Sequence, residues 1–198
     1  MTTKKQIEED TKLIVLPGPL VEKARDASIK RGVGLSDYTA EALLQALRAD
    51  DLGASVAEAV DVYRMVIIQR GAGAIAVPRT SLGYLIEKLN GSHTSDLRNV
   101  WHDSGVWYGR YLSSKMKPNE VFPFLEKELL LSWNLDEVSI KGSIEVAFSF
   151  TSFMMSLEFT ELLLTYVDGL MESLGYRLVE KDYLRGMANL KFDLKPRQ

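Results

Sequence analysis

Leu13-Ile14-Val15-Leu16-Pro17 is a short apolar stretch that predicts a β-strand at the start of the chain. It runs into a helical segment from Pro19 to Arg31, and a Gly-Val-Gly break at residues 32–34 separates this segment from a second one, from Ser36 to about Leu47. One strand and two helices bury too little surface to be stable alone. We therefore expect a second copy of the chain to complete the core.

The residue types at the helix ends support these boundaries. Pro19 suits the first turn of a helix, where a missing backbone N–H costs nothing, and Gly32 ends the segment. Ser36 is a good N-cap residue for the second helix. Apolar residues recur on one face of each helix, at Leu20, Ala24 and Ala27 in the first and at Tyr38, Ala42, Leu43, Ala46 and Leu47 in the second.

This strand-helix-helix order resembles the ribbon-helix-helix family of DNA-binding regulators. The resemblance implies a homodimer whose paired strands form a two-stranded ribbon that enters the major groove of DNA. Aligned through Leu16-Pro17, the base-reading positions are Thr11, Leu13 and Val15; if Gly18 is an insertion, Lys12, Ile14 and Leu16 face outward instead. Either register presents aliphatic side chains, which leave at most contacts with thymine methyl groups.

The charge of this segment adds little to DNA binding. Residues 1–50 hold eight Lys or Arg residues and eight Asp or Glu residues, so they lack the usual basic footprint. Locally, Lys4, Lys5 and Lys12 lie near the predicted ribbon, and the start of the second helix is suited to bind a phosphate. The candidate DNA contacts are Lys4, Lys5, Thr11, Lys12, Leu13, Val15 and Ser36. The alternative is a dimerisation module that has lost DNA binding.

Composition indicates a cytoplasmic protein of more than one module. The chain has 198 residues, 46% of them hydrophobic, and no cysteine, which excludes disulfides and thiolate metal sites. The polar first ten residues do not form a signal peptide, and Glu158 and Glu161 interrupt the most apolar stretch, so we expect no membrane span. The expected parts are a flexible tail (1–10), a ribbon-helix-helix domain (11–50), a connecting helix and linker (51–79) and a second domain (80–198).

Hydrophobic periodicity outlines the second half. Helical spacing predicts helices at Ser55 to Arg70, Thr80 to Leu89, Ser95 to Ser114, Glu120 to Trp133 and Phe153 to Leu174. Alternation with a period of two predicts strands at Val138 to Ile140 and Ile144 to Phe150, and a hairpin of Tyr176 to Tyr183 and Met187 to Leu194. Gly105 and Gly109 permit a neighbouring element to approach closely. Helices packed on a small antiparallel sheet make an α+β domain.

Short motifs occur in a definite order in this half, namely Phe159-Thr160-Glu161, Gly169-Leu170-Met171, Gly175-Tyr176-Arg177-Leu178-Val179-Glu180, Gly186 and Leu190-Lys191-Phe192-Asp193-Leu194. They look like the C-terminal signature of the 4-vinyl reductase domain, and Leu97 to Gly105 with Gly109 resembles that family's helix of spaced glycines. The resemblance covers roughly residues 80–196. It implies a fold similar to subunits of a vesicle-tethering complex and a role as a small-molecule sensor attached to a regulator.

One departure from that family concerns metal binding. Glu180 matches its acidic residue, but the positions of two cysteines that help to hold zinc fall on Tyr183 and Leu190. Without these soft ligands a zinc site is not expected, and His93 and His102 alone make a poor set. We therefore expect neither a metal nor another cofactor.

No arrangement of residues indicates an enzyme. Ser104 lies two residues from His102, so their side chains point to different faces of a helix. Glu158 and Glu161 have the spacing of a carboxylate pair, whereas Glu126 and Glu128 diverge, and acidic residues on helices are usually solvated.

Aromatic residues crowd into the segment from Trp101 to Phe153. Such clusters are commonly core, but an apolar pocket with a few polar groups also fits a ligand site. The candidate ligand-binding residues are Trp101, His102, Trp107, Tyr108, Trp133, Phe148 and Glu180. The first hypothesis is a dimeric transcription regulator that senses a small hydrophobic or aromatic effector. The second is a scaffold or assembly protein that oligomerises through both domains and binds no DNA.

Overall fold

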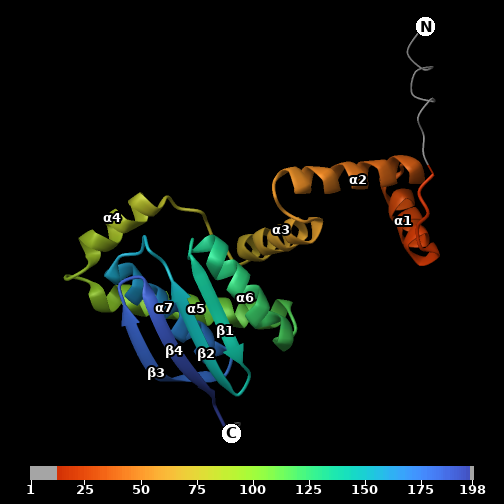
Figure 1. Cartoon of the computed structure of the whole chain (residues 1–198). Coiled ribbons are helices and arrows are strands. Elements are labelled where there is room, and N and C mark those ends of the chain that lie inside the picture. The colour runs from red at the N-terminus through yellow and green to blue at the C-terminus, as the bar shows by residue number, and fades with distance from the viewer. Residues whose placement is uncertain (1–12, 197–198) are drawn as a thin grey trace. The chain divides into compact units, whose positions relative to one another are not determined.

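The computed structural model describes residues 13–196, and the chain divides between Val62 and Tyr63 into two compact units (Figure 1). The division falls within helix α3, which spans Val56–Gly71. Ser55 begins this helix with a capping box, because its hydroxyl accepts the backbone N–H of Glu58 at 3.2 Å while the Glu58 carboxylate accepts the N–H of Ser55.

The first unit consists of the two predicted helices. Helix α1 spans Gly18–Arg31 and ends at Gly32, whose φ of 68° lies in the left-handed region that favours glycine. Helix α2 spans Leu35–Asp51, so it extends beyond the predicted end at Leu47. The prediction that Ser36 is the N-cap is wrong. The first helical bond runs from Tyr38 N to Gly34 O at 2.9 Å, which makes Gly34 the N-cap and places Ser36 in the first turn.

Residues 13–17, which precede α1, form no strand within the single chain. A strand of a two-stranded ribbon pairs with its counterpart in a second copy. The ribbon therefore stays a prediction.

The second unit has the expected α+β fold. Its antiparallel sheet has the order β1-β2-β4-β3, with β1 at Glu137–Gly142, β2 at Glu145–Thr151, β3 at Tyr176–Leu184 and β4 at Met187–Leu194. The helices after α3 are α4 at Arg79–Leu89, α5 at Thr94–Lys115, α6 at Pro118–Ser132 and α7 at Leu157–Ser173. Strands β3 and β4 form the predicted hairpin, and β1 pairs antiparallel with β2.

Two helices cover one face of this sheet. Figure 1 shows α5 and α7 behind the strands and α6 beside β1. The inward residues of β2 and β4 are buried, and they are Val146, Phe148, Phe150, Ala188, Leu190 and Phe192. Glu126 on α6 accepts a hydrogen bond from Ile140 N at 2.6 Å, so this helix protects the outer edge of β1.

Three glycines bring α5 and α7 into close contact. A Cβ at Gly105 would lie 2.0 Å from the carbonyl oxygen of Tyr166, and one at Gly169 would lie 2.2 Å from that of His102. At Gly109 a Cβ would meet the Ser173 hydroxyl at 2.0 Å. The expected role of Gly105 and Gly109 in close packing is therefore confirmed.

Several other boundaries differ from the predicted ones. Met65 and Ile68 are buried, and Ile68 belongs to the core of the second unit, so this unit includes residues 63–79, which the sequence assigned to the connecting segment. Strand β2 begins at Glu145, which leaves Ile144 in the turn. Helix α7 begins at Leu157 because the Ser156 hydroxyl accepts the N–H of Phe159 at 3.2 Å, and Phe153 lies in the loop before it. No helix within residues 13–196 is both long and apolar enough to cross a membrane.

Candidate functional site

The predicted DNA contacts lie before α1 and at the start of α2. Leu13 and Val15 are 94% and 89% exposed, and Ser36 is exposed in the first turn of α2. Lys4, Lys5, Thr11 and Lys12 lie outside the described residues.

The apolar residues of the first unit are mostly exposed to solvent. Among residues 13–62, only Ser28 and Ala49 are buried. Half or more of the side chain of several large apolar residues of α1 and α2 is open to solvent, as it is for Leu20, Ile29, Leu44 and Leu47. An apolar surface of this kind marks an interaction site.

The predicted ligand residues of the second unit fall into several environments. Trp101 on α5 meets Trp133 edge-on with 5.4 Å between ring centroids, and both rings also contact Phe159 on α7. Trp133 lies 5.5 Å from the Tyr166 ring, which in turn lies 6.3 Å from the buried ring of Tyr108. We call these five residues the aromatic cluster, and in it rings pack directly on rings.

The other predicted ligand residues lie outside this cluster. Trp107 is half exposed and stacks on Tyr111, and Phe148 packs against Phe150 in the core of the sheet. Glu180 is exposed and forms an ion pair with Lys191. His102 is half-buried on α5, with its Nε2 3.3 Å from Oε2 of Glu172.

A buried carboxylate, Glu128 on α6, adjoins the aromatic cluster. One of its oxygens accepts a hydrogen bond from the Gln69 amide at 3.1 Å, whereas its Oε2 and the hydroxyl of Tyr108 are buried without a partner. Burial raises the pKa of Glu128 to about 7, and the hydrogen bond from Gln69 only partly opposes this shift. Burial also raises the pKa of Tyr108 and of Tyr166, and the nearby charge of Glu128 raises both further.

Glu128 was not among the predicted site residues, although its place in the sequence carries a signal. The buried positions of α6 are Val121, Leu125, Glu128 and Leu129, so the carboxylate falls on the apolar stripe of its helix. A charged residue at such a position is rarely left unpaired, and in the second unit it marks a functional candidate.

Helix α3 reaches the same buried carboxylate. Besides its bond to Glu128, the Gln69 amide donates to the Ser132 hydroxyl, and Arg64 forms a 2.7 Å ion pair with Glu120 on α6. The second half of α3 is thus joined to α6 by polar side chains on either side of the buried Met65.

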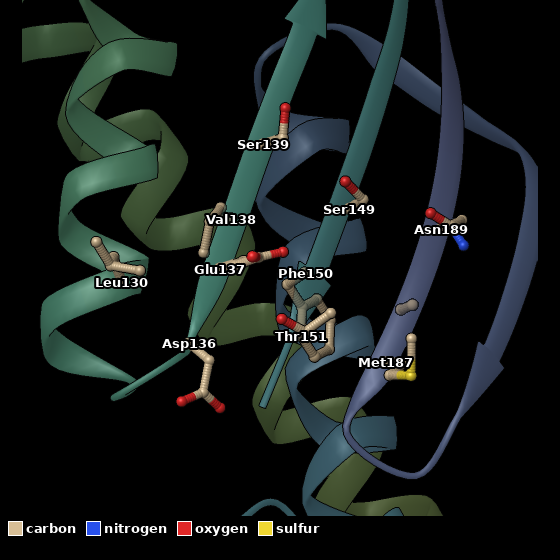
Figure 2. Close-up of a pocket in the computed structure, with 11 residues that line it drawn as sticks. Leu130, Asp136, Glu137, Val138, Ser139, Ser149, Phe150, Thr151, Met187 and Asn189 are labelled. Carbon is tan, nitrogen blue, oxygen red and sulfur yellow. The ribbon is translucent and has the colours of Figure 1, made fainter. Parts of the chain in front are cut away.

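A groove of about 480 Å³ lies on the sheet face opposite α5 and α7 (Figure 2). Ser139, Ser149 and Asn189 are register partners on β1, β2 and β4, and they form a polar row across it. Asp136, Glu137 and Met187 lie toward its end near the β3–β4 turn. Its lining includes none of the predicted ligand residues.

The acidic pair and the serine–histidine pair considered in the sequence have separate partners. Glu161 binds Arg98 at 2.7 Å and accepts from the Tyr183 hydroxyl, while hydrogen bonds at the start of α7 lower the pKa of Glu158. The Ser104 hydroxyl donates to the carbonyl of Val100 at 2.7 Å.

In the described part of the chain, no three His, Cys, Asp or Glu residues are grouped so that they could hold a metal ion.

No protein-family model matches the chain, and no curated protein matches it either. The two family resemblances therefore rest on the motifs quoted for them.

Proposed function

We propose that the chain is a dimeric, DNA-binding transcription regulator of the cytoplasm, without enzymatic activity, whose second unit responds to a small hydrophobic or aromatic effector. The dimer is supported by the lack of a hydrophobic core in the first unit, where only Ser28 and Ala49 are buried among residues 13–62. A second copy would cover the apolar faces of α1 and α2, as the ribbon-helix-helix resemblance implies.

The proposal for DNA binding rests on the same resemblance and on two local features. Leu35 and Ser36 are the first two residues of α2, where backbone N–H groups have no partner within the helix and suit a phosphate. Lys4, Lys5 and Lys12 precede α1 in the sequence and add positive charge. Because Leu13 and Val15 offer no hydrogen bonds to bases, we expect strong dependence on salt and weak discrimination between sequences.

Effector sensing would reach the first unit through α3, which starts in one unit and ends in the other. Gln69 on this helix contacts Glu128 beside the aromatic cluster. An effector that moves the rings of this cluster would change the environment of the Gln69–Glu128 bond. Such a ligand shifts the population of two states by its differential affinity for them.

Binding of duplex DNA to the full chain, measured across a range of salt concentrations, tests the proposal. Replacing Lys4, Lys5 and Lys12 together by Ala should weaken binding to all sequences about equally and flatten the salt dependence. Unchanged binding by the triple variant would refute the proposed contact surface.

A scaffold without DNA binding is the second candidate, and the exposed aliphatic side chains of Leu13 and Val15 favour it. It predicts a dimer that fails to bind DNA even at low salt.

Effector binding can be measured by tryptophan fluorescence, because all three tryptophans lie in the second unit. A bound aromatic compound should perturb their emission and raise the melting temperature.

A further inference from the structure

Phe153 and Met154 project from a rigidly held loop in the second unit. They are 83% and 75% exposed, although their neighbours Ser152 and Met155 are buried. Two large apolar side chains in consecutive positions are thus presented to solvent by a loop whose flanking residues are fixed in the interior.

Hydrogen bonds join this loop to the β3–β4 turn. Ser152 N donates to the carbonyl of Gly186 at 2.6 Å, Gly186 N donates to the Thr160 hydroxyl at 2.9 Å, and Arg185 donates to the carbonyl of Met155 at 3.2 Å. A Cβ at Gly186 would lie 2.1 Å from the Ser152 carbonyl oxygen, so only glycine fits there. The loop and the turn therefore form one ordered corner.

The turn adds two apolar side chains to this corner. Leu184 and Met187 are register partners that flank it, and they are 71% and 52% exposed. We call Phe153, Met154, Leu184 and Met187 the apolar corner. Methionine adapts its shape to a bound surface, and an ordered apolar patch on a folded unit marks an interaction site.

Acidic side chains flank the apolar corner. Asp136 accepts a hydrogen bond from Phe153 N at 2.8 Å, and it lines the groove of Figure 2 together with Glu137 and Met187. Glu158 lies in the first turn of α7, where hydrogen bonds lower its pKa. The β3–β4 turn contributes one positive charge, the guanidinium of Arg185, next to these three carboxylates.

We infer that the apolar corner and the adjoining acidic end of the groove form a docking site for a basic, amphipathic peptide segment of a partner protein. Apolar side chains of that segment would cover Phe153 and Met154, and a lysine or arginine would reach Asp136 and Glu137. A second copy of this chain is a poorer occupant, because a symmetric contact would bring the carboxylates of the two corners together.

Fluorescence anisotropy of a labelled synthetic peptide, added to the full chain, tests this inference. The peptide has leucines at helical spacing and lysines elsewhere, and a control peptide carries glutamates in place of the lysines. The double variant Phe153→Ser with Met154→Ser should bind the lysine peptide at least tenfold more weakly and keep its melting temperature, since both side chains are exposed. Glu137→Gln should weaken binding and its dependence on salt.

The matched control is the double variant Ile144→Ser with Val100→Ser, which removes two apolar side chains that are 70% and 62% exposed elsewhere on the unit. It should bind like the unmodified chain. Equal binding by the two double variants, or equal binding of the glutamate peptide, would overturn the inference. So would self-association of the chain, or binding to phosphatidylcholine vesicles, that the corner variant abolishes, because the occupant would then be a second copy or a lipid surface.

Discussion

Glu128 makes the stability of the second unit depend on pH. Its pKa is raised from 4.5 to about 7 in the folded chain, so between these values the folded state holds a proton that the unfolded state has released. The free energy of unfolding therefore falls as the pH rises through this range, by roughly 3 kcal/mol for this group. Below pH 4.5 both states are protonated, and above pH 7 the full penalty of the buried charge remains.

Replacing Glu128 by Gln should remove this dependence. We compare the unfolding free energy of the variant with that of the unmodified chain at each pH. The difference in favour of the variant should be larger at pH 8 than at pH 4 by roughly 3 kcal/mol. Urea denaturation followed by tryptophan emission measures it, since all three tryptophans lie in the second unit. Glu87→Gln, at an exposed position of α4, should leave the pH profile unchanged. A constant offset between Glu128→Gln and the unmodified chain would contradict the assignment.

Trp101 and Trp107 lie on the same helix in different surroundings. Trp101→Ala removes ring contacts with Trp133 and Phe159, so we expect a loss of about 3 kcal/mol in unfolding free energy. Trp107→Ala removes a half-exposed ring that stacks on Tyr111, and its cost should be about 1 kcal/mol. Chemical denaturation of both variants checks the contrast, and similar losses would show that the aromatic cluster is not a packing centre.

At the scale of elements, the approach of α5 to α7 depends on glycine. Gly105→Ala would place a methyl group 2.0 Å from a backbone oxygen of Tyr166, which cannot move without shifting α7. We expect a loss of about 3 kcal/mol and a lower melting temperature. Gly83→Ala on α4 is the matched control, because a Cβ there meets nothing within 4 Å, and it should stabilise by about 0.5 to 1 kcal/mol. Equal melting temperatures for the two variants would argue against the close helix contact.

At the scale of the whole molecule, the first unit should join two chains. Leu47 is 62% exposed on α2, so Leu47→Lys should disrupt a dimer that buries this side chain, while the second unit, which has its own core, stays folded. Gln45→Lys adds the same charge on another face of α2 and should remain dimeric. Sedimentation at micromolar concentration distinguishes the two variants. A folded, monomeric unmodified chain would rule out the proposed dimer.

The helices and strands of the second unit follow from patterns within the sequence. Helical spacing located α3 to α7 to within a few residues, period-two alternation located the four strands, and Gly32, Gly105 and Gly109 have the roles that their positions predicted. These features are local, because propensity, capping and periodicity act over a few neighbouring residues. The errors are local too. Two nearby residues could begin α2, and the N-cap is Gly34 instead of Ser36.

Which side chains contact one another depends on the packing of the folded chain. Trp101 and Trp133 come together, while Trp107, Phe148 and Glu180, which share their aromatic or acidic character, lie in other surroundings. The burial of Glu128 beside Gln69, and the exposure of Phe153 and Met154 on a fixed loop, likewise depend on how elements far apart in the chain cross. Periodicity gives the face of an element on which a residue lies, but the partner of that face is set by long-range packing.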